Sequence, residues 1–277
     1  MAAVADGFQL TDRPAPIRQI AADLWHSRDL VVMLARKDFV ARFRRATIGM
    51  AWAVGLPLIQ AVVLAAVFSA VARVKTPGVN YPTFVYTGTL AWSFFSGTIT
   101  GASTAIVDQA GMASKIYFPR AVLPIVTVVS NVFAFLPSMV LLIVFALAFG
   151  VPLGLHTFLL IPAALTLIAL ASSFALVAAA LHVYFRDMRY IVQAAVLPWF
   201  WASAVFFPLS YLHHGVLKTL ILLNPATGVI VLFRAAIVGA DRGWTAALPS
   251  CYAFIGVLFA AAILLYRRFD RVFVDLL

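Results

Sequence analysis

Few residues in this sequence could do chemistry, and their spacing excludes the common kinds of catalytic site. The single cysteine, Cys251, has no Cys or His partner at metal-ligand spacing, and His213 and His214 are adjacent, so on a helix their side chains diverge by about 100 degrees. No lysine follows a glycine, so the Gly-Lys-Ser/Thr loop that cradles phosphates is absent. We therefore predict no metal site, no catalytic residue and no cofactor in this chain.

The composition places these residues in a membrane protein. Of 277 residues, 64% are hydrophobic and 11% are charged, with a mean hydropathy of +1.02. Soluble domains contain roughly 45 to 50% apolar and about 25% charged residues. The composition excludes a water-soluble enzyme and predicts an all-α polytopic membrane protein.

Six apolar segments are long enough to cross a bilayer, which takes about 20 helical residues. They are residues 48–72, 82–107, 121–149, 157–185, 190–212 and 244–266. Between the last two, residues 216–223 and 228–238 are apolar but separated by Asn224 and Pro225, and each piece is too short to cross. We predict a re-entrant helix pair there, a cytoplasmic segment at 1–46, a transmembrane domain at 47–266 and a cytoplasmic tail at 267–277.

The distribution of basic residues predicts the orientation. With six spans, 15 of the 20 Lys and Arg residues lie on the side of both termini and 5 on the other. The positive-inside rule then places both termini in the cytoplasm, whereas a seventh span would export Arg267, Arg268 and Arg271.

The energy source is predicted to lie outside the chain. No Asp, Glu, Lys or Arg occurs at 76–107, 121–185, 190–217 or 243–266. Charged groups inside spans form proton relays and ion sites, so their absence argues against proton coupling and weakens the case for sodium coupling. If ATP drives this protein, a partner subunit binds it.

Three cytoplasmic stretches are suited to such a partner or to the membrane surface. Residues 17–34 repeat apolar positions at helical spacing and predict an interfacial helix. The basic run that follows either anchors the chain to anionic lipid or contacts an acidic partner or a substrate phosphate. Residues 108–120 are too polar to cross but long enough for a short helix that transmits a partner's movement. The basic run consists of Arg36, Lys37, Arg42, Arg44 and Arg45.

Five stretches together resemble the permease subunit of ABC exporters for cell-surface polysaccharides. They occur in the family's order over nearly the whole chain, at 44–52, 115–120, 183–190, 223–228 and 232–234. The resemblance implies a homodimer in the bacterial cytoplasmic membrane, with each subunit docked on one of two ATPase subunits that bind ATP and magnesium. The implied cargo is a lipid-linked glycan such as O-antigen, teichoic acid or capsule.

The resemblance also assigns roles to segments. It makes 17–34 the interface helix, 108–120 the coupling helix and 216–238 the pair of gate helices, with Asn224, Pro225 and Arg234 as gate residues. The family commonly carries an acidic residue three positions before this arginine, where this chain has Val231. The residues implied in ATPase coupling are Asp108, Lys115, Tyr117, Phe118, Pro119, Arg120, Arg186 and Asp187. By themselves, Arg186 and Asp187 are equally consistent with a solvated turn.

We expect the substrate path between two copies, because one six-helix bundle leaves little room for a polymer. A lipid pyrophosphate would first meet Arg42, Arg44 and Arg45. Aromatic rings stack against sugars without fixed register, although interfacial belts and lipid-facing rings explain most aromatics in membrane proteins. The candidate path aromatics are Trp52, Trp92, Phe95, Trp199, Trp201 and Phe207.

Two other functions fit the sequence. An ABC permease for a drug or small lipid would need the same architecture without the glycan. An ATP-independent lipid flippase or scramblase would work in liposomes without any ATPase.

Overall fold

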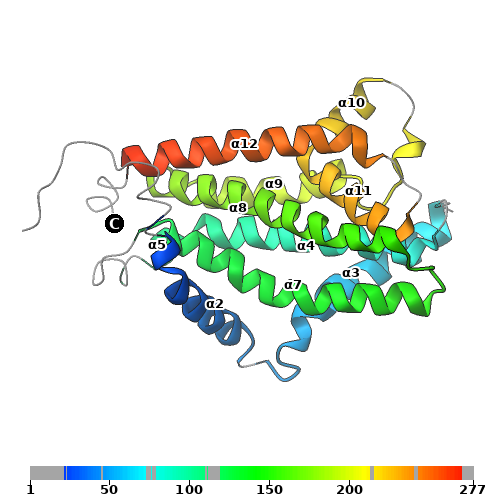
Figure 1. The fold of residues 1–277 in the computed structure, drawn as a ribbon, viewed down its shortest axis with the longest axis horizontal. Helices are drawn as coiled ribbons and strands as arrows, with labels where there is room; N and C mark the ends of the chain where they lie inside the picture. Colours follow the sequence, from blue (N-terminus) through cyan, green and yellow to red (C-terminus); the bar gives the residue numbers. More distant parts are fainter. Residues whose placement is uncertain are drawn as a thin grey trace, which may run out of the picture.

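A computed structural model describes residues 22, 24–44, 46–72, 76, 79–109, 111, 119–212, 215–239 and 243–269. The regular structure in these ranges is helical, and Figure 1 shows the long helices packed lengthwise in one bundle. The helices are α2 (Arg28–Phe43), α3 (Ala51–Val67), α4 (Tyr81–Ser103), α5 (Ala105–Asp108), α7 (Val122–Ala148), α8 (Leu160–Tyr184), α9 (Met188–Ala202), α10 (Val216–Leu223), α11 (Pro225–Val238) and α12 (Trp244–Phe269). A π-helical turn at Phe68–Ala72 extends α3, and 3-10 turns occupy Leu155–Leu159 and Leu209–Tyr211.

Four of the described helices are long and apolar enough to cross a membrane, namely α3, α7, α8 and α12. Helices α10 and α11 together could form a fifth, but they meet at an angle of 80° around Asn224. All six apolar segments contain helix, as the sequence predicts. Helices α4 and α9 fall outside the group of four, α9 because it has only 15 residues.

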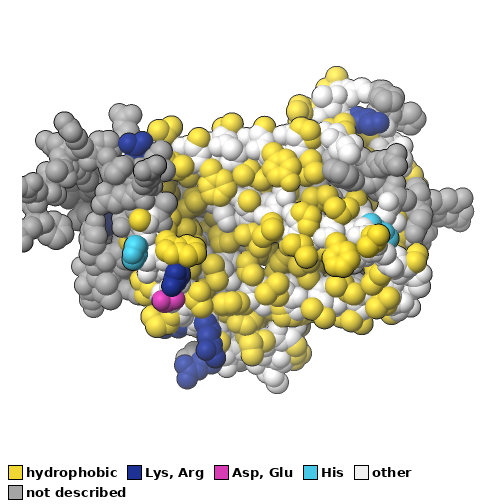
Figure 2. All heavy atoms as spheres, viewed as in Figure 1, with side chains coloured by type: hydrophobic (Ala, Val, Ile, Leu, Met, Phe, Trp, Pro, Cys, Tyr) yellow, Lys and Arg dark blue, Asp and Glu magenta, His cyan; other side chains and the backbone are white. Residues whose placement is uncertain are grey.

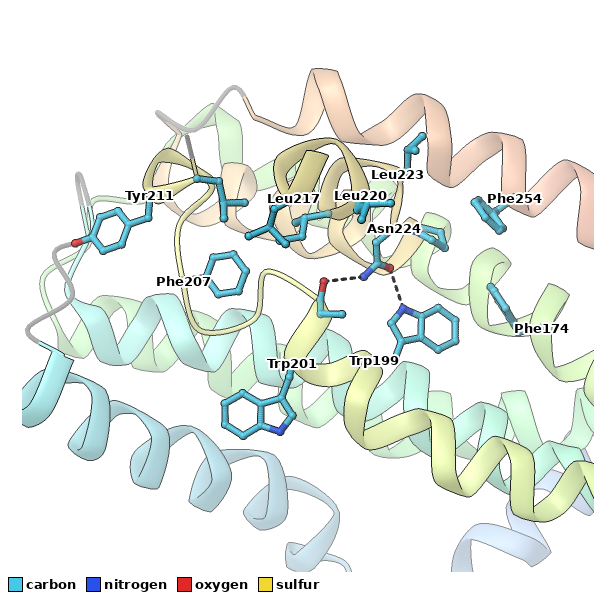
Figure 3. A pocket seen from close by; sticks show the side chains of 14 residues that line it. Phe174, Trp199, Trp201, Phe207, Tyr211, Leu217, Leu220, Leu223, Asn224 and Phe254 are labelled. Atoms are coloured by element: carbon cyan, nitrogen blue, oxygen red, sulfur yellow. Dashed lines mark hydrogen bonds between the residues drawn. The ribbon is translucent and has the colours of Figure 1, made fainter. Parts of the chain in front are cut away.

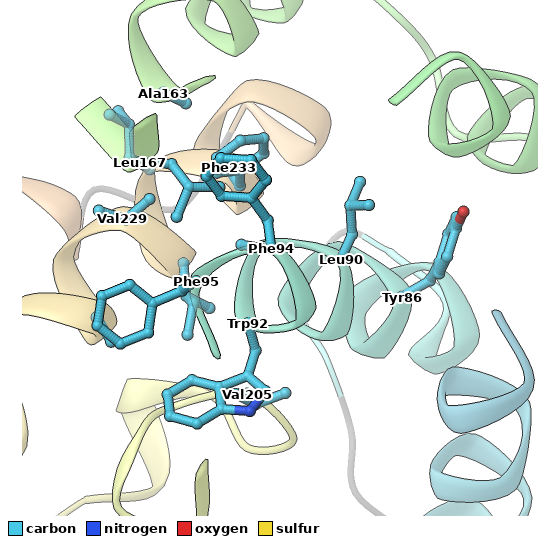
Figure 4. Close-up of a cluster of buried hydrophobic side chains, with 14 of the residues drawn as sticks. Tyr86, Leu90, Trp92, Phe94, Phe95, Ala163, Leu167, Val205, Val229 and Phe233 are labelled. Atoms are coloured by element: carbon cyan, nitrogen blue, oxygen red, sulfur yellow. The ribbon is translucent and has the colours of Figure 1, made fainter. Parts of the chain in front are cut away.

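Helix α4 forms the centre of the bundle. Its side chains radiate between α8, α11 and the segment after α9 (Figure 4). The helix is rich in hydroxyl residues, and two of them bond within it: Thr87 donates to the carbonyl of Thr83 at 2.8 Å and Thr89 to that of Val85 at 3.0 Å. Such back-bonding lets polar residues lie in a buried helix. A helix whose residues are mostly buried within the bundle can therefore be less apolar than its neighbours.

Helix α9 ends ten residues before the predicted boundary of its segment at residue 212. It stops at Ala202, and the backbone of Ser203 turns to an extended conformation with φ −99° and ψ 147°. The Asn224 side chain donates to the Ala202 carbonyl at 3.1 Å and to the Ser203 hydroxyl at 2.9 Å. A distant amide thus satisfies a carbonyl that a longer helix would have used.

The N-terminal helical region extends further than predicted. We expected 17–34 to be helical and the basic run to follow it; residues 22 and 24–26 are helical, 17–21 and 23 lie outside the described residues, and α2 continues from Arg28 to Phe43, past Arg36, Lys37 and Arg42 of the run. Its apolar stripe continues too: Val31 and Ala35 are buried against Val122 and Val126 of α7. The described helix is therefore anchored along the first half of α7, with Arg36 and Lys37 on its exposed side.

Candidate functional site

An open groove of about 530 Å³ lies between α3 and α9, with α4 as its floor. Gln60 of α3 and Ser93 and Ser96 of α4 give it polar groups, and Trp92 and Trp201 contribute aromatic surface. Most residues of α3 and α9 are exposed or only half-buried in the single chain. The groove is therefore a place where polar and aromatic groups meet beside two helices that lack full cover.

The predicted path aromatics divide into packed and accessible residues. Trp92 and Phe95 are buried, and both meet Trp199: the ring centroids of Trp92 and Trp199 are 6.2 Å apart, and those of Phe95 and Trp199 are 5.1 Å apart. Edge-to-face geometry of this kind stabilises a core. Phe95 is thus a packing residue in this subunit, while Trp92 also forms part of the groove floor and Trp201 is 47% exposed.

The remaining two predicted path aromatics lie elsewhere. Trp52 is half-buried in the first turn of α3, outside the groove lining. Phe207 lies beyond the end of α9, where its ring packs 5.1 Å from that of Phe206. The structure therefore does not bring all six aromatics into one continuous track.

Asn224 is a hydrogen-bonding hub between α9 and the bent pair α10 and α11 (Figure 3). Its Oδ1 accepts from the indole N–H of Trp199 at 2.9 Å and from the backbone N–H of Ala226 at 3.1 Å, which makes it the N-cap of α11. Its Nδ2 donates to Ala202 and Ser203, as described above. All four hydrogen-bonding positions of the amide are in use. One side chain thus fixes the end of α9 against the start of α11.

Arg234, the other predicted gate residue, is buried in α11. Its guanidinium donates to the Val205 carbonyl at 2.5 Å and lies over the Phe84 ring, 3.5 Å from its centroid. Val231, at the position that is commonly acidic in the resembled family, is fully buried and apolar. As the sequence indicates, no carboxylate is available at position 231, and a carbonyl and an aromatic face contact the charge of Arg234. Pro225 is buried at the first position of α11. Proline has no backbone N–H, and at this position a helix makes no hydrogen bond with one.

The predicted phosphate-binding arginines are not equivalent. The Arg42 guanidinium forms a salt bridge with Asp38 at 2.7 Å and donates to Asn131 Oδ1 at 2.7 Å. Ser130 donates to the same Asp38 carboxylate at 2.6 Å, and Asn131 donates to Thr98 of α4 at 3.1 Å. Arg42 is therefore engaged within the subunit, in a polar network that joins α2, α7 and α4.

Only part of that network has a signal in the sequence. Asp38 lies four residues before Arg42, at the helical spacing of an ion pair, whereas Thr98, Ser130 and Asn131 lie far from both in the chain and match no motif. Arg44 is exposed at the end of α2, and Arg45 lies outside the described residues. Figure 2 shows hydrophobic side chains over α7, α8 and α12, with basic side chains at the α2 end and near α10.

The predicted coupling residues that can be placed lie at the α2 end of the bundle. Asp108 is exposed at the end of α5, and Arg186 and Asp187 are exposed in the turn between α8 and α9. That turn lines a hollow of about 580 Å³. Pro119 and Arg120 are half-buried just before α7. Lys115, Tyr117 and Phe118 lie outside the described residues.

The described residues contain no group of three His, Cys, Asp or Glu side chains placed to hold a metal ion. Cys251 is fully buried in α12.

The sequence matches that of known membrane transporters. Residues 29–238 match the ABC-2 type transporter family. The chain is 30% identical over 218 residues to the O-antigen export system permease protein RfbA of Myxococcus xanthus, which covers 78% of this chain and 83% of that protein. It is 24% identical over 238 residues to a protein of the same name from Klebsiella pneumoniae, covering 86% and 88% of the two chains, and 25% identical over 207 residues to another from that organism, covering 74% and 79%.

Proposed function

Because this chain belongs to the ABC-2 type transporter family, we propose that it is the membrane-spanning subunit of an ATP-driven exporter of O-antigen or a related cell-surface glycan. The observation that carries the proposal is the likeness to a named O-antigen permease over 78% of this chain and 83% of that protein. The chain is a multi-pass membrane protein that matches a transport permease. Its own residues would therefore bind the cargo and guide it across the membrane.

We propose a six-span topology with both termini in the cytoplasm of the bacterial inner membrane. Helix α9 has 15 residues and is about 22 Å long, so it would cross only with the help of the segment that follows it. Helices α10 and α11 would dip into the opposite face and return, since a single span cannot bend by 80° without exposing backbone groups to lipid. This topology keeps α2, α5 and the Arg186 turn on the cytoplasmic side.

We propose that two copies of the chain form the path, with the groove between α3 and α9 facing the partner copy. The incomplete burial of α3 and α9 in one subunit supports this arrangement. Gln60, Ser93 and Ser96 offer hydrogen bonds to sugar hydroxyls, while Trp92 and Trp201 offer aromatic faces. The glycan is proposed to be lipid-linked, with Arg44 meeting its phosphate group at the cytoplasmic face.

The work is proposed to come from two ATPase subunits that bind ATP and magnesium at the cytoplasmic end. Their movement would be received by residues 108–120 and by the turn with Arg186 and Asp187. The hollow beside that turn would give an ATPase subunit a surface to contact. The polar network of Arg42 would hold α2 to α7 and α4 while this happens. The spans would then rearrange around the cargo.

Depletion of the chain in its host tests the function. We expect surface glycan to disappear and lipid-linked glycan to accumulate inside the cell, and re-expression of the chain should reverse both effects. Unchanged surface glycan after complete depletion would refute the proposal. Loss of export of a drug or small lipid, without glycan accumulation, would instead support the smaller-cargo permease.

A further inference from the structure

A second cavity lies on the other side of α9 from the groove floor. It measures about 790 Å³ and is bounded by the end of α9, by helix α10 of the bent pair, and by the facing sides of α8 and α12 (Figure 3). Leu217 and Leu220 of α10 face Phe207 across it, and Phe174 and Phe254 close its far end.

The lining of this cavity is suited to hydrocarbon. Of the described lining residues, Asn224 carries the only amide, and all four of its hydrogen-bonding positions are taken by protein groups. The indole N–H of Trp199 is one of those partners. The other polar side-chain groups of the lining are the indole N–H of Trp201 and the hydroxyl of Tyr211, which Figure 3 shows directed away from Phe207 and the leucines. So few groups would replace few of the hydrogen bonds that a polar ligand makes to water, whereas an apolar chain would lose none.

The α10 side of the cavity is exposed and apolar. Leu217 and Leu220 are 63% and 59% exposed, and Val216 beside them is 78% exposed. An exposed apolar patch of this kind is unfavourable in water and favourable against lipid tails. A lipid chain could therefore enter the cavity sideways along α10.

Trp201 joins this cavity to the groove between α3 and α9, because its side chain lines both. On one side of it lie Gln60, Ser93 and Ser96, and on the other lies the apolar cavity. The groove is mostly apolar but carries these three polar side chains, whereas the amide of the cavity is already engaged within the protein. Two sites that differ in this way and share one tryptophan fit the two halves of an amphiphile. A plain phospholipid needs only the apolar site.

We propose that this cavity binds the hydrocarbon chain of the exported amphiphile while its glycan occupies the groove, with Trp201 between them. The inference rests on the proposed function, since it assigns a place to the lipid part of that cargo. It commits to the hydrocarbon chain of the lipid-linked glycan as the occupant, represented in the test by a polyprenyl phosphate, with ordinary membrane phospholipid as the alternative that the experiment separates.

Photocrosslinking of the full chain in nanodiscs tests the proposal. A benzophenone side chain is placed at Leu220 in the cavity or at Leu165, which is 63% exposed on α8 and lies outside the cavity lining. The nanodiscs are made of phosphatidylcholine with equal mole fractions of a polyprenyl phosphate and phosphatidylglycerol. Mass spectrometry of the adducts gives the ratio of polyprenyl to phosphatidylglycerol at each position.

We expect this ratio to be about tenfold higher at Leu220 than at Leu165, which corresponds to about 1.4 kcal/mol of preference. Leu217→Trp should remove the excess by filling the cavity, and Leu264→Trp, at a position 64% exposed on α12, should leave it unchanged. Equal ratios at the two positions, or an excess that survives Leu217→Trp, would overturn the proposal.

Failure of this proposal is distinguishable from failure of the proposed function on which it rests. Re-expression of the protein could restore surface glycan while the ratios at Leu220 and Leu165 are equal. That result would support the exporter function and reject the hydrocarbon-binding cavity. If depletion leaves surface glycan unchanged, the exporter itself fails.

Discussion

At Gly88 the backbone of α4 comes so close to the segment after α9 that no side chain fits. A Cβ there would lie 2.7 Å from the Val205 carbonyl oxygen and 3.0 Å from the Arg234 guanidinium. Because Arg234 donates to that same carbonyl, a larger residue would displace a buried charge as well as the backbone.

We expect Gly88→Ala to lower the free energy of unfolding by about 1 to 3 kcal/mol through overpacking. Gly97→Ala in the same helix is the control, since a Cβ at Gly97 meets nothing within 4 Å. Helix propensity predicts a gain of about 0.5 to 1 kcal/mol for that change. Thermal unfolding of both variants in detergent measures the difference, and equal midpoints would contradict the assignment.

Arg42 shows why a basic run is ambiguous in sequence. The same side chain could meet a phosphate, a lipid or an internal carboxylate, and the structure places it on Asp38 and Asn131. Nothing in the local sequence announces Asn131, which is 89 residues away.

A double-mutant cycle tests whether this contact contributes to stability. Arg42→Gln and Asn131→Leu should each lower the free energy of unfolding. The loss in the double variant should be smaller than the sum of the two single losses, by at least about 0.5 kcal/mol. Arg44→Gln, at an exposed position, should add to Asn131→Leu without interaction. Chemical unfolding gives the three free energies, and strict additivity of the Arg42 pair would show that the network has no energetic role.

Helix α9 and the bent pair are held together by one amide, so their coupling depends on Asn224. Replacing it with Leu would leave the Ala202 carbonyl and the Trp199 indole N–H without these partners. Because Trp199 is half-buried and Ala202 is exposed, each loss should cost less than the roughly 1 to 3 kcal/mol of a fully buried group.

We expect Asn224→Leu to increase amide hydrogen exchange at both the end of α9 and the start of α11, because the Ala226 N–H loses its cap as well. Ser203→Ala, which removes only one of the four hydrogen bonds, should change exchange much less. Faster exchange confined to α11 would mean that Asn224 caps its own helix without joining it to α9.

At the scale of whole helices, composition predicts the helical segments well, because a bilayer requires long apolar helices. It predicts their ends less well. The end of α9 depends on Asn224, which lies 22 residues beyond Ala202 in the chain, and the extent of α2 depends on an apolar stripe whose partners are on α7. Sequence named Trp199 and Asn224 for different roles, and only the fold brings them into contact.

For the whole molecule, the sequence predicts a bundle without its own energy source, and the structure shows a subunit with exposed sides. Helices α3 and α9 flank a groove that one chain leaves open, and exposed polar residues lie at the α2 end. The assembly that would cover these surfaces cannot be derived from one sequence, because it depends on contacts between chains.

Transport in proteoliposomes tests the central claim, which is that this chain moves its cargo with energy supplied by a separate ATPase. Lipid-linked glycan would be added on the cytoplasmic side of vesicles that contain either the chain alone or the chain with its ATPase. The fraction of the glycan that becomes protected inside the vesicles would be measured with and without ATP. The account predicts protection only when both subunits and ATP are present. Equal protection by the chain alone, without ATP, would contradict it and establish an ATP-independent flippase.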